Sequence, residues 1–280
     1  MKKISRRSFL AASGLTIAAL ALTACGGSAS TASSAAASSV AASSEAASTS
    51  AAAAELTTVE AGKLTMATNA AFPPYEMTTD AGEFEGIDID TAKAIAEKLG
   101  LELQIDDMDF DAALLSVQQG KADIVMAGVT VTDERKAVMD FSDSYATGIQ
   151  SIIVPEGSDI TSPDDLAGKK IGTQRGTTGY IYCSDDFGDD AVVAYDDGLT
   201  AVQALNNGQV DAVVIDNAPA KEFVAANPGL VILDTSYAEE DYAIGLAKGS
   251  ALEDAVNAAL EELKADGTLQ SIVDKYITAE

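Results

Sequence analysis

Apolar residues are arranged along residues 63–276 in two alternating ways, as short continuous runs and as longer stretches with helical spacing. The runs predict strands and the spaced stretches predict helices. Their regular alternation is typical of an α/β fold with mainly parallel sheets. We expect strands at 63–68, 101–105 and 124–127, and helices at 88–99, 109–119, 251–265 and around 269–276. Ser162 and Pro163 mark a further helix start, as N-cap and first helical residue.

Two segments of the chain resemble each other. Residues 113–126 and 201–214 both read as the end of a helix, a glycine, an aspartate and a buried strand. The first strand runs into Gly128 and Thr130, and the second into Asp216. Because open α/β sheets bind ligands at the carboxyl ends of their strands, the repeat predicts two similar lobes with polar groups at equivalent places. Helix–glycine–strand units are also common in unrelated proteins, so the repeat alone is compatible with coincidence.

The first 24 residues have the features of an export signal. A basic start at Lys2, Lys3, Arg6 and Arg7 precedes an apolar core at 15–22 that is too short to span a bilayer permanently. Residues 22–25 read as a lipobox, which predicts a lipoprotein with Cys25 as its lipidated, palmitate-bearing N-terminus. Residues 5–10 also fit a twin-arginine signal, so both export routes stay open.

Residues 26–54, the main part of a predicted linker at 25–58, consist almost entirely of Ala, Ser, Thr and Gly. A segment without large apolar residues cannot offset its ordering entropy, so we expect a disordered linker behind the lipid anchor. The folded part is then expected to begin at Val59. A tether of this length favours the outer face of the cytoplasmic membrane of a Gram-positive type of cell over a periplasm.

Charge and composition exclude several classes of function. The chain carries 17 basic and 44 acidic residues, a net charge of −27, which falls to −31 once the four basic residues of the signal are removed. So acidic a surface argues against nucleic acid and anionic lipid as partners. Histidine is absent and only two cysteines occur, so we expect no Ser-His-Asp triad, no metal site and no cofactor.

Two charged residues are candidates for binding a zwitterion. Arg135, in a predicted helix start, can grip a carboxylate through two parallel hydrogen bonds. Asp216, at the end of a predicted strand, can accept from an ammonium group. Thr177 and Thr178 lie in a Gly-Thr-Thr-Gly turn that offers hydroxyls and amides. Each of these features also has an ordinary structural reading, as a solvated arginine, a helix cap or a turn.

From about Leu64 to Tyr276 the chain resembles the polar amino-acid-binding family of ABC-transporter solute-binding proteins. The resemblance rests on short segments in the expected order: 67–76 (ATNAAFPPYE), 86–90 (GIDID), 120–123 (GKAD), 127–135 (AGVTVTDER), 140–145 (DFSDSY), 165–172 (DLAGKKIG) and 176–179 (GTTG).

The resemblance implies a two-lobed, periplasmic-binding-protein-like fold with two hinge strands. The first lobe would comprise 59–145 plus 245–280 and the second 150–239, with hinges at 146–149 and 240–244. Arg135, Thr130, Gly128 and Thr178 would hold the ligand's α-carboxylate, and Asp216 with the Gly128 carbonyl its α-ammonium. Phe72 and Phe110 would sandwich the side chain, and Asn69 and Gln174 would lie near its end. Ala127, Val129 and Thr177 complete the site that the resemblance implies.

The resemblance also implies a role and a ligand class. We expect a monomeric binding protein that closes around a polar L-amino acid and delivers it to the permease subunits of an ABC importer. Members that take cationic side chains often carry an acid where Asn69 stands, and Ile215 before Asp216 is apolar, so a neutral side chain such as that of glutamine is favoured. The alternatives are a secreted enzyme of the same fold, such as a cyclohexadienyl or arogenate dehydratase, and the sensory module of a receptor. The chain's end at Glu280, with no membrane helix or signalling domain, speaks against the module.

Overall fold

The computed structural model describes residues 56–277. The predicted export signal, Cys25 and the linker up to residue 55 lie outside the described residues. Leu56 packs against the apolar core, so the folded part begins before the predicted Val59. None of the helices in this described range is both long and apolar enough to cross a membrane.

The first lobe contains a five-stranded sheet with the strand order β5-β1-β6-β14-β7 and a small sheet β2-β3-β4. Strands β5, β1 and β6 are parallel neighbours, and β14 and β7 complete the sheet through antiparallel pairs. The elements of this lobe are β1 (Lys63–Thr68), β2 (Ala71–Phe72), β3 (Glu76–Thr78), β4 (Phe84–Glu85), α1 (Ile87–Leu99), β5 (Glu102–Asp107), α2 (Phe110–Gln118), β6 (Ile124–Val125), α3 (Asp133–Val138), β7 (Met139–Phe141), β14 (Gly245–Ala247), α7 (Glu253–Ala265) and α8 (Thr268–Tyr276).

The second lobe contains a sheet with the order β10-β9-β11-β8-β12, with β13 also paired to β8. Strands β9, β10 and β11 are parallel, and β8 runs antiparallel to β11. Its elements are β8 (Ala146–Pro155), η1 (Pro163–Leu166), β9 (Ile171–Gln174), α4 (Thr178–Phe187), η2 (Asp189–Ala191), β10 (Val192–Tyr195), α5 (Gly198–Asn206), β11 (Ala212–Asp216), α6 (Asn217–Ala226), β12 (Leu230–Ile232) and β13 (Ala238–Tyr242).

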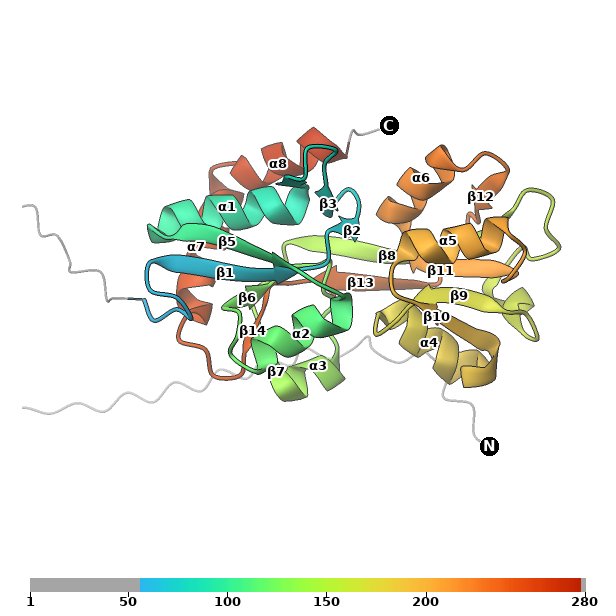
Figure 1. Ribbon diagram of the computed structural model, residues 1–280, viewed down its shortest axis with the longest axis horizontal. Helices are drawn as coiled ribbons and strands as arrows, with labels where there is room; N and C mark the ends of the chain where they lie inside the picture. Colours follow the sequence, from blue (N-terminus) through green and yellow to red (C-terminus); the bar gives the residue numbers. More distant parts are fainter. Residues whose placement is uncertain (1–55, 278–280) are drawn as a thin grey trace, which may run out of the picture. The chain divides into compact units, whose positions relative to one another are not determined.

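Two strands connect the lobes. The chain passes into the second lobe along β8 and returns along β13, and these strands pair antiparallel from Ala146↔Tyr242 to Gln150↔Ala238 (Figure 1). Gly148 is required at this crossing, because a Cβ there would lie 2.5 Å from the Tyr242 ring. The α/β, two-lobed fold class is thereby confirmed.

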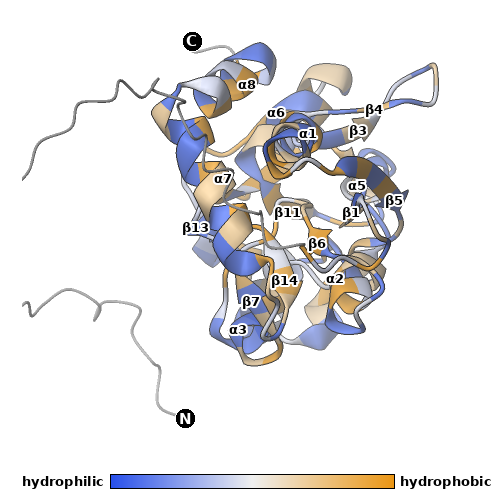
Figure 2. Ribbon diagram, turned by 90° about the vertical axis from the view of Figure 1, so that its left-hand side faces the viewer, coloured by the Kyte–Doolittle hydropathy of each residue, from blue (hydrophilic) through white to orange (hydrophobic). Residues whose placement is uncertain are grey.

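Apolar side chains hold each sheet to its helices. Helix α1 buries Ile89, Ala92 and Ile95, the face that its spacing predicts, and ends at Gly100 in the left-handed conformation. The strand β6 is hydrophobic throughout, whereas α7 alternates hydrophobic and hydrophilic residues (Figure 2). This difference is expected of a strand covered on both faces and of a helix covered on one.

Several predicted bounds differ from the structure. The strand expected at 124–127 ends at Val125, because β14 pairs only with Ile124 and Val125. The strand expected at 101–105 lies at Glu102–Asp107, where it pairs with β1 residue for residue. The helix start at Ser162 yields only a single 3₁₀ turn. The other predicted helices agree with α1, α2, α7 and α8 to within two residues at either end.

Candidate ligand-binding site

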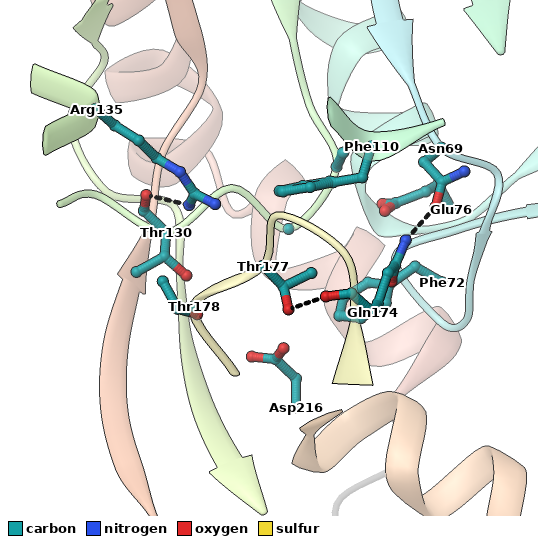
Figure 3. Close-up of a pocket in the computed structure, with 12 residues that line it drawn as sticks. Asn69, Phe72, Glu76, Phe110, Thr130, Arg135, Gln174, Thr177, Thr178 and Asp216 are labelled. Carbon is teal, nitrogen blue, oxygen red and sulfur yellow. Dashed lines mark hydrogen bonds between the residues drawn. The ribbon is translucent and has the colours of Figure 1, made fainter. Parts of the chain in front are cut away.

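The carboxyl ends of the parallel strands in both sheets face a common pocket. Asn69 follows β1, Gly128 follows β6, Gln174 ends β9 and Asp216 ends β11. The two helix–glycine–strand units thus place polar groups at one site, as the internal repeat predicts. The pocket lining is Asn69, Phe72, Glu76, Phe110, Ala127, Gly128, Thr130, Arg135, Gln174, Thr177, Thr178 and Asp216 (Figure 3).

All but one of the predicted binding residues meet in this pocket. The exception is Val129, which is fully buried in the apolar cluster of the first lobe, while its carbonyl accepts from the Ala243 amide at 3.1 Å. The structure therefore places Val129 in the core beside the pocket. One lining residue, Glu76, was not predicted.

Arg135 enters the pocket from the short helix α3. The Thr132 hydroxyl caps this helix by accepting from the Arg135 amide at 3.1 Å. The guanidinium donates to the Thr130 carbonyl at 2.7 Å and to the Gly176 carbonyl of the other lobe at 3.1 Å, and lies 5.3 Å from the centre of the Phe110 ring. It is 8 % exposed, and burial lowers its pKa from the ordinary value. Among the described residues no carboxylate forms an ion pair with it, so a buried cation is left for an external anion.

Asp216 carries the opposite charge and approaches the pocket from the other side (Figure 3). One carboxylate oxygen accepts from the Tyr242 hydroxyl, and the other from the Gln150 amide at 2.9 Å. Both donors stand on the strands that connect the lobes. Burial raises the pKa of Asp216 to about 7, and the hydrogen bond from Tyr242 opposes this rise. The carboxylate is therefore held by its surroundings and poised to accept from a ligand's ammonium.

A buried carboxylate behind the pocket connects the two lobes. Glu240 on β13 accepts from the hydroxyls of Thr130 at 3.1 Å and Thr178 at 2.9 Å, and from the Gln150 amide at 2.9 Å. A hydroxyl has one proton, so both threonine hydroxyls donate theirs to Glu240 and can only accept elsewhere. The Thr178 hydroxyl already accepts from the Gln150 amide at 3.4 Å. The two hydroxyls consequently suit an ammonium, and not the α-carboxylate to which the resemblance assigns Thr130 and Thr178. Arg135 and backbone amides are left for a carboxylate.

The far end of the pocket is formed by aromatic rings and amides. Phe72 and Phe110 are both 6 % exposed. The Asn69 amide donates to the Met108 carbonyl at 3.0 Å and accepts from Gln174 at 2.9 Å, so a polar bridge joins the lobes here as well. The lining side chains approach so closely that the enclosed cavity is only about 10 Å³, room for about one water. The lining side chains of the two lobes therefore lie close together in this structure.

Comparisons with known proteins agree with this architecture. Residues 64–279 match the family described as bacterial extracellular solute-binding proteins, family 3. The chain is 33 % identical over 226 residues to the L-cystine-binding protein TcyJ of Escherichia coli (strain K12), covering 79 % of this chain and 85 % of that protein. It is 35 % identical over 202 residues to the ABC transporter glutamine-binding protein GlnH of Bacillus subtilis (strain 168), covering 70 % and 74 % respectively.

A solved structure shows the same likeness in three dimensions. The arginine-, lysine-, histidine-binding protein ArtJ from Geobacillus stearothermophilus superposes with a TM-score of 0.75 at 34 % identity, covering 78 % of this chain and 96 % of that one.

These relatives are transport proteins that bind amino acids, and they decide against the dehydratase alternative. A family of extracellular proteins also implies an extracytoplasmic location. The sequence resemblance is thereby confirmed: the chain belongs to the bacterial extracellular solute-binding proteins, family 3.

Proposed function

We propose that the protein is the substrate-binding lipoprotein of an ABC importer, which captures a polar L-amino acid outside the cytoplasm and delivers it to the permease. The relatives that bind cystine, glutamine or arginine, lysine and histidine support an amino acid as the ligand. The protein acts as a monomer, tethered to the outer face of the cytoplasmic membrane through lipid on Cys25 and the linker of residues 25–58.

One observation carries the proposal. A buried guanidinium, with no carboxylate partner among residues 56–277, faces a buried carboxylate across the same small pocket. The α-carboxylate of an amino acid pairs with Arg135, and its α-ammonium with Asp216 and the threonine hydroxyls. A zwitterion thus satisfies both charges at once, whereas a simple anion or cation would satisfy only one.

The ligand is captured by hinge closure. Residues 59–145 and 245–280 form one rigid lobe and 150–239 the other, and 146–149 and 240–244 bend as the hinge. Arg135 already contacts Gly176 of the second lobe, and Gln174 contacts Asn69 of the first. The ligand adds contacts to both lobes that exist only in the closed state, and this difference in contacts drives the closure. The closed form is the one that docks on the permease.

Thermal unfolding of the purified chain, screened against the common L-amino acids, tests the proposal. A ligand at about 100 times its dissociation constant adds about 2.7 kcal/mol of stability, which raises the Tm by roughly 5–10 °C for a protein of this size. We expect one or a few polar amino acids to produce this shift. If none does after the protein has been refolded to remove carried-over ligand, amino-acid binding is excluded.

Small-angle scattering tests the closure. The radius of gyration should fall when saturating ligand is added. A scattering curve that does not change would contradict hinge closure while leaving the binding itself untouched.

A further inference from the structure

Glu240 is a buried carboxylate that lies behind the pocket lining and binds groups of both lobes. It stands on β13, one of the two strands that connect the lobes, and is 7 % exposed. Its oxygen Oε2 accepts from the Thr130 hydroxyl of the first lobe, the Thr178 hydroxyl of the second and the Gln150 amide of β8. The other oxygen has no donor among residues 56–277. The hydrogen bonds that hold this side chain therefore converge on one oxygen at the place where the lobes meet.

The two threonines belong to parts of the chain that separate when the lobes separate. Thr130 lies in the loop after β6, and the next residue, Val131, donates its amide to the Asp241 carbonyl at 3.0 Å. Thr178 is the first residue of α4, which packs against β9, β10 and β11 of the second lobe. Because one oxygen of Glu240 accepts from both hydroxyls, the two side chains cannot move apart without breaking at least one of these bonds.

These bonds are compatible with a ligand in the pocket. Arg135 and Gln174 also bind across to the opposite lobe, but their side chains line the pocket and a ligand engages the same groups. The hydroxyls of Thr130 and Thr178 lie next to each other although they come from different lobes (Figure 3). Their protons go to Glu240 behind the pocket, so an ammonium needs no proton from them. The bonds to Glu240 can thus persist in the empty and the filled site.

Glu240 also places a negative charge between the two charged residues of the pocket. Burial lowers the pKa of Arg135, and the charge of Glu240 opposes this change. Burial raises the pKa of Asp216, the hydrogen bond from Tyr242 opposes this rise, and the charge of Glu240 adds to it. The side chain therefore acts both as an acceptor and as a charge, and substitutions by glutamine and by alanine separate the two effects.

Building on the proposed hinge closure, we propose that Glu240 is a positioning residue that latches the lobes together. It holds the hydroxyls of Thr130 and Thr178 side by side as acceptors, and so stabilises the closed arrangement before an amino acid enters. Part of the unliganded population is then already closed, so the ligand has to supply less free energy to close the rest. Loss of the latch shifts the unliganded protein towards the open form and leaves the liganded form closed.

Small-angle scattering of the purified chain without ligand tests the latch. We expect a larger radius of gyration for unliganded Glu240→Ala than for the unliganded wild type. Both should reach the same, smaller value in saturating L-glutamine or L-arginine, whichever raises the Tm of the wild type more. A general loss of structure would instead enlarge the liganded form as well.

Two variants serve as controls for the scattering. Glu240→Gln keeps an oxygen that accepts from the hydroxyls and removes the charge, so its unliganded radius should stay near that of the wild type. Glu239→Ala removes the neighbouring acid, which is exposed on the other face of β13, and should leave the radius unchanged.

The threonine side of the contact provides a second measurement. Thr178→Val removes one donor with little change in volume, so it should enlarge the unliganded radius by less than Glu240→Ala does. Added to Glu240→Ala it should have no further effect, because the two residues act through one contact. In titration calorimetry with the same amino acid, Glu240→Ala should bind about 10-fold more weakly than the wild type, since less of it is closed before binding.

Equal radii for the unliganded wild type and Glu240→Ala would overturn the latch while leaving amino-acid binding intact. If Glu240→Ala does not fold, the unliganded radius of Thr178→Val decides, and a value equal to that of the wild type overturns the latch. If the unliganded radii differ as expected but the wild type binds no amino acid, the latch stands and the proposed function fails.

Discussion

The two helix–glycine–strand units fold alike but hold opposite charges in different ways. In the first unit, α2 leads through Gly120 into β6, and the charged residue Arg135 comes only after a loop and the start of α3. In the second, α5 leads through Gly208 into β11, whose last residue is Asp216 itself. Both glycines have positive φ, 66° and 67°, so the turn that joins helix to strand is the same.

The contacts that hold the two charged side chains differ more than the two helix–glycine–strand units themselves do. Asp216 is held by Tyr242 and Gln150 on the two connecting strands. Arg135 is held by a carbonyl of its own loop and by the Gly176 carbonyl of the opposite lobe. The comparison teaches that the cation's geometry depends on a contact between the two lobes. The anion's state depends on its burial, and hence on pH.

Arg135→Ala is the substitution with the largest expected effect on this comparison. Truncating one partner of a buried charge pair costs about 3 kcal/mol or more, so affinity for the amino acid should fall more than about 100-fold. Arg175→Ala is the matched control, since this arginine is 55 % exposed, pairs with exposed Asp196 and donates to the Ala194 carbonyl. Equal effects of the two variants in titration calorimetry would mean that Arg135 is no carboxylate clamp.

Asp216→Asn tests the other charge and its pH dependence. The pKa of Asp216 is raised to about 7 from the ordinary 3.8. Between about pH 4 and 7 the folded chain therefore keeps a proton that the unfolded chain has lost, and this group makes the protein less stable as pH rises. The unfolding free energy of the wild type, measured with urea at several pH values, should thus fall more steeply over this window than that of Asp216→Asn.

Ligand affinity should follow the opposite trend. An ammonium needs the ionised carboxylate, so the affinity of the wild type should rise from pH 5 to 8. The affinity of Asp216→Asn should stay nearly constant over this range and be roughly 30-fold lower than that of the wild type at pH 8. Asp211→Asn is the control, because this exposed aspartate, just before β11, accepts from the Lys170 amide. Parallel pH profiles of wild type and Asp216→Asn would show that Asp216 does not titrate in this range.

The sequence predicted the elements from local pattern, whereas the full set of pocket residues came from the resemblance to the solute-binding family. The glycines that follow α2 and α5, and the polar residues at the strand ends, could be read from spacing alone. Glu76 could not, since it lies in β3, a strand of three residues that is too short to show a period. Only its register opposite Phe72 turns it inward. Val129 was misplaced for the converse reason, because in a loop between two lining residues the pattern does not reveal which side chain points away.

Gly176→Ala tests the dependence of the Arg135 site on closure. A Cβ at this position would lie 1.6 Å from the Asp111 carboxylate of the other lobe, and φ is +74°. The two lobes could not approach as closely, so affinity should fall roughly 10-fold and scattering should show a more open liganded state. Gly188→Ala carries similar backbone strain at φ +87° with nothing within 4 Å, and should cost stability without affinity. Restored affinity in Gly176→Ala/Asp111→Ala would confirm the contact, and a loss as large in Gly188→Ala would refute it.

The helix caps give the smallest and finest test. Thr132 caps α3, which carries Arg135, and Thr177 caps α4, which begins at Thr178. Asp197 caps α5 away from the pocket, accepting from the Thr200 amide at 2.7 Å. Replacing each with alanine should cost about 1 kcal/mol of stability, measured by urea unfolding.

The affinity for the ligand should respond differently in the three variants. α3 has only six residues, so losing its cap loosens the guanidinium itself and should weaken binding a few-fold. Thr177→Ala should weaken it less, because the Thr178 hydroxyl stays fixed by Glu240, and Asp197→Ala should not weaken it at all. If all three variants lose affinity in proportion to their loss of stability, the caps affect binding only through overall stability. Arg135 would then depend on its local contacts no more than Asp216 does.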